Sequence, residues 1–317
     1  MKVYITRKIQ PKAIKFLREK GFTVSVYPKD KPIPRNVLLK NIKNIDALIP
    51  LLTDKIDKEV IDKMSKCKII ANYAVGYENI DIEYAKKKNI IVTNTPDVLT
   101  DSTADLAMTL TLACTRRLFE SRKLIDDKKF KHWKPDLLLG YEIKNKIFGI
   151  VGAGRIGEAV AKRAYAFGAK IIYNSLFINK KIEKKFGAKK VSLNKLLKTS
   201  DFVSLHVPSN KGTYHLLNKK NLNLLKKSAV LVNTSRGSII DEDALVNVLQ
   251  KKKIFSTGLD VYEHEPKIHP GLLKLENVVL APHIGSATVE ARTSMAMLAA
   301  KNVASVLKGN KPITPVL

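Results

Sequence analysis

The sequence has very few cysteines. Of its 317 residues only Cys67 and Cys114 are cysteine, and both lie in apolar surroundings without a partner motif. A disulfide framework or a zinc site would need more cysteine or histidine at short, regular spacing. We therefore expect two buried thiols and no metal site.

Long apolar runs are also missing. No stretch approaches the ~18 uninterrupted apolar residues of a membrane-spanning helix. The N-terminus, MKVYITRK, is typical of a first strand rather than of a signal peptide. We identify no low-complexity segment and expect no appended regulatory domain. These absences predict a cytoplasmic protein that has no membrane partner.

Acidic residues are scarce relative to basic ones, 29 against 57, which gives a net charge of +28. Such a surplus can mark a nucleic-acid-binding surface. Here the lysines are scattered over nearly every predicted helix and loop, without interleaved aromatic residues or a nucleic-acid motif. We interpret them as a lysine-rich solvated surface and predict no nucleic-acid partner. The positive field would still attract anionic metabolites.

The first hundred residues alternate between strand and helix patterns, which is typical of parallel βαβ units. Three prolines at 28, 32 and 34 indicate a loop after the second strand. The predicted strands are 3–6, 22–27, 45–52, 67–75 and 89–95, and the predicted helices are 11–20, 57–65 and 81–88.

A long helical pattern over 101–123 follows, and it is apolar on most of its circumference. Such a helix is expected to be buried between domains or subunits. A second alternation then ends in a helix over about 287–307. The first predicted strand of this alternation begins at 146. The others cover 169–174, 201–207, 229–235, 256–262 and 277–282. The fold class is therefore α/β, with two doubly wound parallel-sheet domains, the larger of Rossmann type.

Residues 146–157, KIFGIVGAGRIG, contain a glycine fingerprint of the form G-x-G-x-x-G between a buried strand and a helix. Gly152 permits the turn, Gly154 leaves room for a pyrophosphate, and Gly157 allows close helix–strand packing. The amides at the start of the helix would face the phosphates. This context predicts dinucleotide binding by the fingerprint, including Arg155 and Ile156.

Polar residues at the carboxyl ends of strands are candidates for chemistry, because ligands bind there in parallel sheets. Arg236 could hold a carboxylate bidentately or simply pair with an aspartate. His283 could donate a proton to a carbonyl, but His206 lies in a similar place. Glu265 is a candidate acid, with Glu263 as its neighbour and competitor. Composition does not separate these alternatives.

Several motifs together resemble the D-isomer-specific 2-hydroxyacid dehydrogenase family, and look most similar to its glyoxylate/hydroxypyruvate reductase branch. Besides the fingerprint, the resemblance rests on NTSRGSIIDEDAL (233–245), GLDVYEHEP (258–266) and APHIG (281–285). ANYAVGYENID (71–81) and VTNTPDVLTDSTADLAM (92–108) add to it. The resemblance covers essentially the whole chain, in the family's order.

The resemblance implies a role for each matching residue. Arg236 would bind the substrate carboxylate, His283 would be the general acid/base, and Glu265 would hydrogen-bond that histidine. Val75 and Gly76 would bind the carboxylate through their amides. His206 would have a cofactor-pocket or structural role. Further positions implied to contact the cofactor are Thr103, Val207, Pro208, Thr234, Ser235, Asp260, His283 and Gly285.

The resemblance also implies the domain organisation. Residues 1–98 with 287–317 would form a flavodoxin-like substrate-binding domain, to which the C-terminal helix returns. Residues 99–286 would form the NAD(P)-binding Rossmann domain. The helical stretch 101–123 would support a homodimer.

One departure concerns the cofactor. The acidic residue that would bind the adenosine ribose is replaced by Ser175, which follows Asn174. Neither residue would repel a 2′-phosphate, and Lys180 and Lys181 follow closely, although Leu176 stands where a basic residue is usual. We therefore predict NADP or NAD as cofactor, with NADPH modestly preferred.

The predicted reaction is reduction of a small 2-oxo acid, such as glyoxylate or hydroxypyruvate, to the D-2-hydroxy acid. A 3-phosphoglycerate dehydrogenase shares these motifs and is the alternative within the family. Formate dehydrogenase is disfavoured, because that branch has glutamine where Glu265 stands. A co-repressor-like NAD-binding interaction protein is the alternative of another class.

Overall fold

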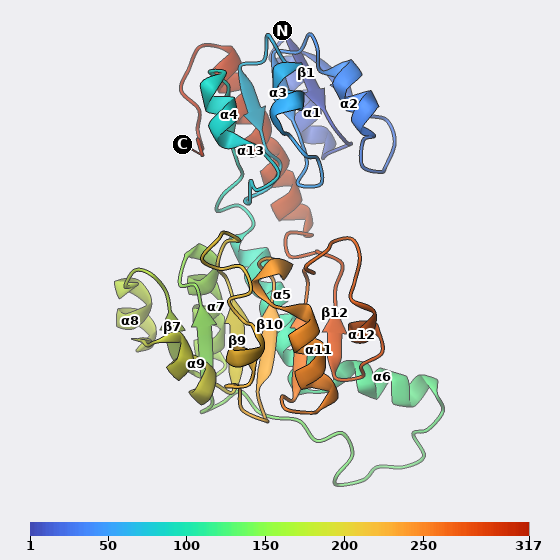
Figure 1. Ribbon diagram of the computed structural model, residues 1–317, viewed down its shortest axis with the longest axis vertical. Helices are drawn as coiled ribbons and strands as arrows, with labels where there is room; N and C mark the ends of the chain where they lie inside the picture. Colours follow the sequence, from blue (N-terminus) through green and yellow to red (C-terminus); the bar gives the residue numbers. More distant parts are fainter. Residues whose placement is uncertain (317) are drawn as a thin grey trace. The chain divides into compact units, whose positions relative to one another are not determined.

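The computed structural model describes residues 1–316, which divide into two compact units. The first contains residues 1–99 and 286–316, and the second contains Thr100–Gly285. Each unit is a parallel sheet with helices on both faces (Figure 1). The predicted fold class is confirmed.

The first unit has five parallel strands in the order β2-β1-β3-β4-β5, which is the flavodoxin-like order. The last helix, α13, packs against α1 and β4, so the end of the chain returns to this unit. Its strands are β1 (Lys2–Ile5), β2 (Thr23–Val26), β3 (Ala47–Ile49), β4 (Ile69–Ala71) and β5 (Ile91–Thr93). Its helices are α1 (Pro11–Glu19), α2 (Arg35–Asn41), α3 (Lys58–Asp62), α4 (Ile82–Lys87) and α13 (Val289–Leu307).

The helix α2 directly follows the proline-marked loop and was not predicted from the sequence. Pro34 is the residue that precedes the first turn, where a fixed φ and a missing N–H do no harm to a helix. Leu38 and Ile42 are buried in the core of the unit. The prolines therefore delay the helix and do not prevent it.

The second unit has seven parallel strands in the order β12-β11-β10-β9-β6-β7-β8. From β6 onwards this is the Rossmann order with one added strand. Its strands are β6 (Ile147–Val151), β7 (Lys170–Asn174), β8 (Lys189–Lys190), β9 (Phe202–Leu205), β10 (Val230–Asn233), β11 (Ser256–Leu259) and β12 (Val278–Leu280). Its helices are α5 (Thr100–Thr115), α6 (Leu118–Asp126), α7 (Arg155–Ala166), α8 (Lys180–Phe186), α9 (Leu193–Thr199), α10 (Lys219–Leu222), α11 (Glu242–Gln250) and α12 (Pro270–Leu273), with the 3₁₀ helix η1 (Gly237–Ile239).

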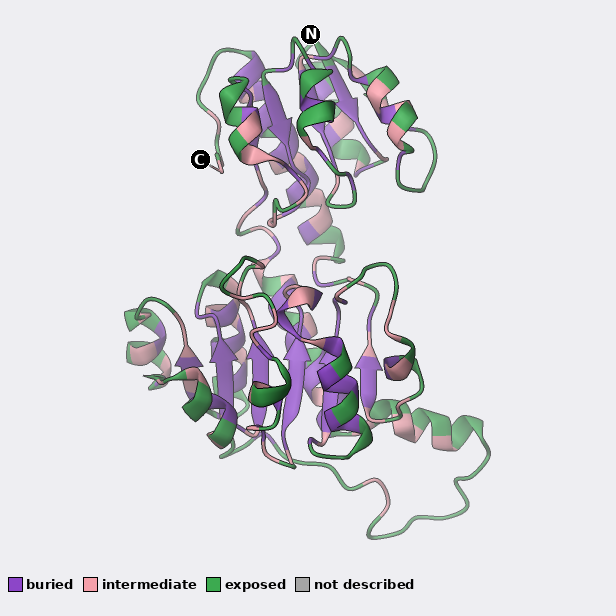
Figure 2. Cartoon of the chain, in the orientation of Figure 1, coloured by how far each residue is buried: buried purple, intermediate pink, exposed green. Residues whose placement is uncertain are grey.

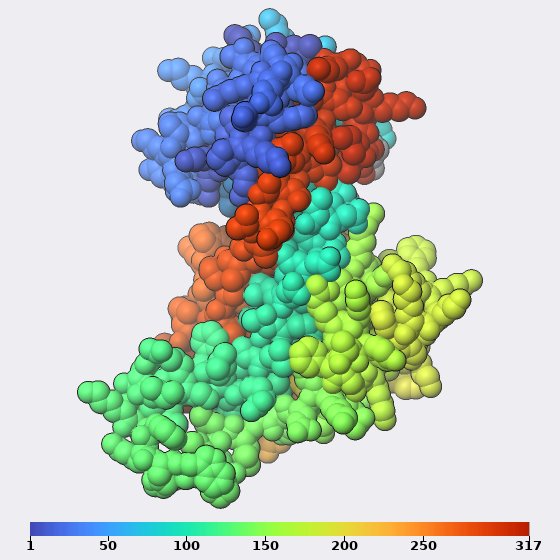
Figure 3. Space-filling model, turned by 180° about the vertical axis from the view of Figure 1, so that it is seen from behind, coloured from blue at the N-terminus to red at the C-terminus, as the bar shows by residue number. Residues whose placement is uncertain are grey.

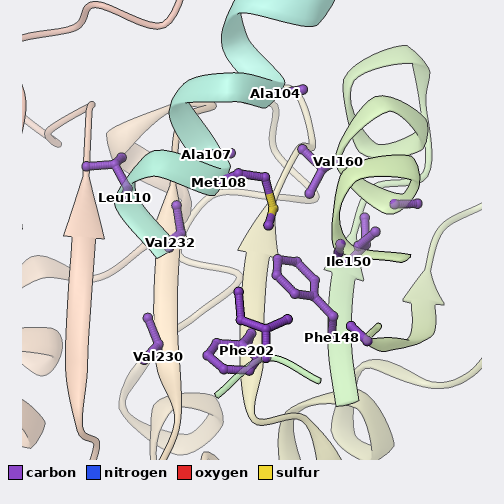
Figure 4. Packing of buried hydrophobic residues seen from close by; sticks show 14 of the residues in the cluster. Ala104, Ala107, Met108, Leu110, Phe148, Ile150, Val160, Phe202, Val230 and Val232 are labelled. Carbon is purple, nitrogen blue, oxygen red and sulfur yellow. The ribbon is translucent and has the colours of Figure 1, made fainter. Parts of the chain in front are cut away.

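Apart from the edge strands β2 and β8, the strands of both sheets are largely buried, and most exposed residues lie on the outer faces of the helices and in the loops (Figure 2). In the second unit α5, α7 and α8 pack on one face and α9, α10 and α11 on the other. Figure 4 shows the hydrophobic core between the sheet and the first of these two helix layers. In it, Met108 of α5 lies among Phe148, Phe202 and Val232 of the sheet. Burial on both faces explains why these strands are continuous apolar runs.

The single helix predicted over 101–123 is wrong, because the structure breaks it into α5 and α6. Arg117, between them, has a left-handed backbone with φ 52°. Tyr141, on a returning segment, donates its N–H to the Thr115 carbonyl at 3.2 Å, and its own carbonyl accepts the Thr115 hydroxyl at 3.0 Å. This segment supplies a hydrogen-bond donor to the last carbonyl of α5, in place of a further helical turn. The α5 part of the stretch is buried against β10, β11 and β12 within the second unit.

Both cysteines are buried and free, as predicted. Burial raises the pKa of each thiol to about 12. Within residues 1–316 no cluster of three or more histidine, cysteine, aspartate or glutamate side chains could hold a metal ion. In the same part of the chain, no helix has both the length and the apolar character needed to cross a bilayer.

Candidate active site

The glycine fingerprint forms the turn between β6 and α7. Gly152 has φ +97°, and a Cβ there would lie 2.5 Å from the His206 carbonyl oxygen. A Cβ on Gly157 would lie 2.0 Å from the Gly152 carbonyl oxygen. At both positions only glycine fits, because the neighbours are backbone atoms.

Gly154 is different, because a Cβ there would meet no atom within 4 Å. It caps the N-terminus of the twelve-residue helix α7, whose first residues are Arg155 and Ile156. The open space beside it allows a phosphate to approach the helix amides closely. The turn also lies at the switch point of the sheet, where β6 is flanked by β7 and β9. The residues present therefore fit a dinucleotide.

His283 and Glu265 form a hydrogen-bonded pair. The imidazole Nδ1 lies 2.8 Å from Glu265 Oε2, and each side chain is about a third exposed, 29% and 30%. The other carboxylate oxygen accepts the Tyr262 N–H at 3.0 Å. The pair is held at one end by the backbone and is accessible to a small molecule.

Opposing effects act on the pKa of Glu265. Burial raises it, but the hydrogen bond and charge of His283, the Tyr262 N–H and the charge of Arg236 together hold it below its ordinary value. Glu265 is therefore ionised at neutral pH. A carboxylate at this distance fixes the orientation of the imidazole ring.

The loop that carries His283 is tied down by Asp260. This fully buried side chain accepts the N–H groups of Ile284 and Gly285, each at 2.7 Å. The Asp260 carbonyl accepts the His283 N–H at 2.9 Å. His283 has a left-handed backbone with φ 56°, which the three bonds maintain. Asp260 thus positions the histidine.

Arg236 lies three residues beyond the end of β10, in a turn held by Asn233. The Asn233 amide donates to the Arg236 carbonyl at 2.8 Å, and its Oδ1 accepts the N–H and hydroxyl of Ser235 at 3.0 and 2.8 Å. Gly237 then packs so closely that a Cβ would lie 1.8 Å from the Tyr262 carbonyl carbon. This contact joins the turn of Arg236 to the loop of Glu265.

The structure separates the alternatives that the sequence left open. His206 contacts Ser204 Oγ through Nε2 at 2.8 Å, and desolvation lowers its pKa to about 3. It is neutral at physiological pH and does not pair with Glu265. Glu263 pairs with His215, 2.6 Å from its Nε2, and does not touch His283. Of these candidates, His283 and Glu265 are the two that pair with each other.

The other predicted cofactor positions lie around the fingerprint turn and the strand ends. A Cβ added to Gly152 would lie 2.8 Å from Val207 Cγ1, and one added to Gly285 would lie 3.5 Å from the Thr103 side chain. The Thr234 hydroxyl oxygen is buried and has no hydrogen-bond partner among the described residues. An unsatisfied buried hydroxyl is consistent with a ligand that completes it. Pro208 lies at the surface after β9, where its carbonyl accepts the Thr213 hydroxyl.

Val75 and Gly76 lie in the first unit, in the turn after β4. The predicted strand 67–75 ends earlier, at Ala71. The Val75 carbonyl accepts the Asn94 amide at 2.7 Å, and the Gly76 carbonyl accepts the Asn72 amide at 2.8 Å. These bonds fix the turn through its carbonyls. The role of its N–H groups in substrate binding stays a prediction.

Sequence reasoning missed several residues that hold the site. Asn233 and Gly237 stand within the NTSRG motif, so their place beside Arg236 was a usable signal. Glu242, buried at 5% exposure, accepts the Glu263 N–H at 2.8 Å. Its pattern, an acidic residue in the first turn of a helix, is typical of surface helices. Nothing in the sequence distinguished it.

Comparisons with known proteins identify the family of this chain. Residues 108–285 match the family model "D-isomer specific 2-hydroxyacid dehydrogenase, NAD binding domain". The chain belongs to this family. A glyoxylate reductase of Thermococcus litoralis is 51% identical over 315 residues, which cover 98% of this chain and 95% of that protein. The resemblance seen in the sequence is confirmed.

Two solved structures are similar over their whole length. A protein from Thermus thermophilus is 42% identical with a TM-score of 0.95, and all of both chains is covered. The NADPH-dependent glyoxylate/hydroxypyruvate reductase of Sinorhizobium meliloti is 30% identical with a TM-score of 0.85, covering 99% of this chain and 97% of that one. The protein is therefore an oxidoreductase of this family that uses a nicotinamide cofactor.

Proposed function

We propose that the protein reduces glyoxylate and related small 2-oxo acids, such as hydroxypyruvate, to D-2-hydroxy acids. The observation that carries this proposal is the accessible His283–Glu265 pair beside Arg236, at the strand ends that also carry the dinucleotide fingerprint. The similarity to proteins named glyoxylate reductase supports the substrate class.

The chain's own residues supply binding and proton transfer. The Arg236 guanidinium binds the carboxylate and polarises the adjacent ketone. The protonated His283 donates its Nε2 proton to the carbonyl oxygen, and Glu265 stabilises the imidazolium before the transfer. The nicotinamide cofactor, when bound, supplies the hydride. In this proposal Thr103, Asp260, Gly285 and the stretch Thr234–Arg236 surround the nicotinamide, and the fingerprint holds the pyrophosphate.

The substrate is tested by a panel of acids with the purified protein. We expect glyoxylate and hydroxypyruvate to be reduced with kcat/KM of about 10⁴ M⁻¹s⁻¹ or more. Oxidation of 3-phosphoglycerate should be much slower. Faster turnover of 3-phosphoglycerate would favour the alternative within the family. Cofactor binding with no turnover of any acid would favour an interaction protein.

The adenosine end of the proposed cofactor site carries no acidic residue at the end of β7. Asn174 donates its amide to the Val191 carbonyl at 2.9 Å, and Ser175 follows at the sheet edge. Lys181 is paired with Glu158, so it is not an unpaired cation for a phosphate. Lys190 on β8 instead reaches the Leu176 carbonyl at 3.0 Å, directly beside Ser175. We propose that Lys190 and Ser175 accommodate the 2′-phosphate of NADPH.

We expect NADPH to be modestly preferred over NADH, as judged by kcat/KM with glyoxylate. Lys190→Met should raise the KM for NADPH several-fold, because a point charge near the phosphate is lost. It should leave the KM for NADH unchanged. Lys189→Met, the exposed neighbour in the same strand, is the matched control. A tenfold preference of the native protein for NADH, about 1.4 kcal/mol, would contradict the proposal.

We also propose that the protein is a cytoplasmic homodimer, with residues 1–98 and 287–317 as the substrate-binding domain and 99–286 as the cofactor-binding domain. Support for the dimer comes from residues 118–141, where several apolar side chains are exposed. No α6 residue is buried, and Figure 3 shows this segment along the edge of the second unit, in green. The exposed apolar residues are Leu118, Phe119, Ile125, Phe130, Trp133, Leu139 and Tyr141. A patch of this kind is typical of a protein interface.

A further inference from the structure

A second imidazole–carboxylate pair lies close to the first, because Glu263 stands two residues before Glu265. His215 Nε2 is 2.6 Å from Glu263 Oε1, and the Glu263 side chain is only 12% exposed. The Tyr214 ring stacks on the His215 ring, with centroids 4.0 Å apart, and its hydroxyl donates to the same carboxylate oxygen at 3.4 Å. Tyr214 therefore contacts both members of the pair and helps to hold them together.

The backbone of His215 connects the pair to the turn of Arg236. The His215 N–H donates to the Ser238 carbonyl at 2.9 Å, and the Leu217 N–H donates to the Ile239 carbonyl at 3.0 Å. Ser238 and Ile239 belong to η1, directly after Arg236. His215 thus bridges two segments: its backbone binds the one after Arg236, and its side chain binds the one before Glu265.

Glu263 is also fixed through its backbone. Its N–H donates to the buried Glu242 carboxylate at 2.8 Å, and burial raises the pKa of Glu242 above its ordinary value. The ionisable groups around Glu263 are therefore His215 and Tyr214 on one side and Glu242 on the other, with His264 and His269 near Glu242. Its neighbour Tyr262 packs against Gly237 and donates its N–H to Glu265.

We propose that His215 and Glu263 are positioning residues, which clamp the segment 262–265 so that Glu265 holds the His283 imidazole in its productive orientation. This inference rests on the proposed function of His283 as the proton donor. Neither residue of the clamp touches the reacting atoms. Tyr262 and Glu265 share one short loop and are joined by the hydrogen bond from the Tyr262 N–H to the Glu265 carboxylate. A displacement of Glu263 would therefore move both partners of this hydrogen bond.

Two single variants test the clamp. His215 has φ 47°, a region that asparagine tolerates well, so His215→Asn removes the long side chain without adding backbone strain. Glu263→Gln removes the charge from the other side. We expect each to lower kcat/KM for glyoxylate about tenfold, within the loss that a misplacement of ~1 Å causes. The KM for the cofactor should be unchanged.

A purely structural role would not move the pKa of His283, so this pKa is the decisive measurement. A looser Glu265 stabilises the imidazolium less, and the His283 pKa, followed by NMR titration, should shift downward in both variants. The alkaline limb of kcat/KM for reduction, where activity falls as His283 loses its proton, should shift to lower pH in the same variants. The double variant should lose no more kcat/KM for glyoxylate than the more impaired single variant, because the two residues act as a unit.

His264→Gln is the matched control, since His264 lies between the two glutamates and is exposed. We expect the His264→Gln variant to keep the native pKa of His283 and the native kcat for glyoxylate. An unchanged His283 pKa in both clamp variants would overturn the inference, even if their melting temperatures fall. The NMR readout does not depend on turnover. If the native protein reduced no 2-oxo acid, the proposed function would be wrong. The NMR titration of His283 would still show whether His215 and Glu263 position Glu265.

Discussion

Replacing His283 with asparagine should lower kcat for glyoxylate reduction by a factor of ~10²–10⁴, the usual contribution of a general acid. Asparagine keeps a hydrogen-bond donor on a shorter side chain but has no transferable proton. Its short side chain also leaves the Asp260 bonds to Ile284 and Gly285 in place. The dissociation constant of the cofactor, measured by fluorescence titration, should therefore change little.

His206→Asn is the control, because His206 was the competing candidate and its pKa of about 3 leaves it neutral. It should lose far less kcat than the His283 variant. The assignment is wrong if His206→Asn abolishes turnover while His283→Asn stays near the native rate. Glu265→Gln should lie between the two, because the imidazole would keep a hydrogen-bond partner and lose a charged one.

The parts of the fold that the sequence predicted are those with a strong local signal. Apolar runs flanked by glycine and polar residues located the strands, since buried parallel strands leave an almost uninterrupted pattern. The fingerprint 152–157 was identified because each glycine has a separate steric reason, and the 2.0 Å and 2.5 Å approaches at Gly157 and Gly152 show two of them. The short strand β8 lacks such a run and was missed.

The break between α5 and α6 could not be predicted from the same pattern. Apolar periodicity continues through Arg117, and what ends α5 is a segment that returns from about 25 residues later, where Tyr141 bonds to Thr115. A contact of that range leaves no mark within the helix itself. Helix propensity is a weak prior that such tertiary contacts override.

For the site, strand ends gave the candidates and resemblance selected among them. The physical basis of that selection is visible only in three dimensions. Glu263 and Glu265 are two residues apart, yet one faces His215 and the other faces His283. The loop direction that separates them is set by Gly237 and the buried Glu242. No local pattern encodes which glutamate meets which histidine.

Arg236→Lys should raise the KM for glyoxylate about 10- to 100-fold, the loss expected when a charge-assisted hydrogen bond of ~1.5–3 kcal/mol is removed. The Arg236 guanidinium already donates from Nη1 to the Ser235 carbonyl at 2.7 Å. Its planar fork can do this and still present other N–H groups to a carboxylate, whereas an ammonium cannot reproduce that geometry. The KM for the cofactor should remain within about twofold.

The lysine variant retains the positive charge that helps to lower the pKa of Glu265. The acid limb of the pH profile should therefore stay in place, which distinguishes loss of the carboxylate clamp from disturbance of the His283–Glu265 pair. Arg35→Lys is the matched control, since Arg35 holds Asp57 and Glu59 on the surface of the first unit, each at 2.6 Å. The KM of the Arg35→Lys variant for glyoxylate should equal that of the native protein. An unchanged KM for every acid tested with Arg236→Lys would remove Arg236 from the substrate site.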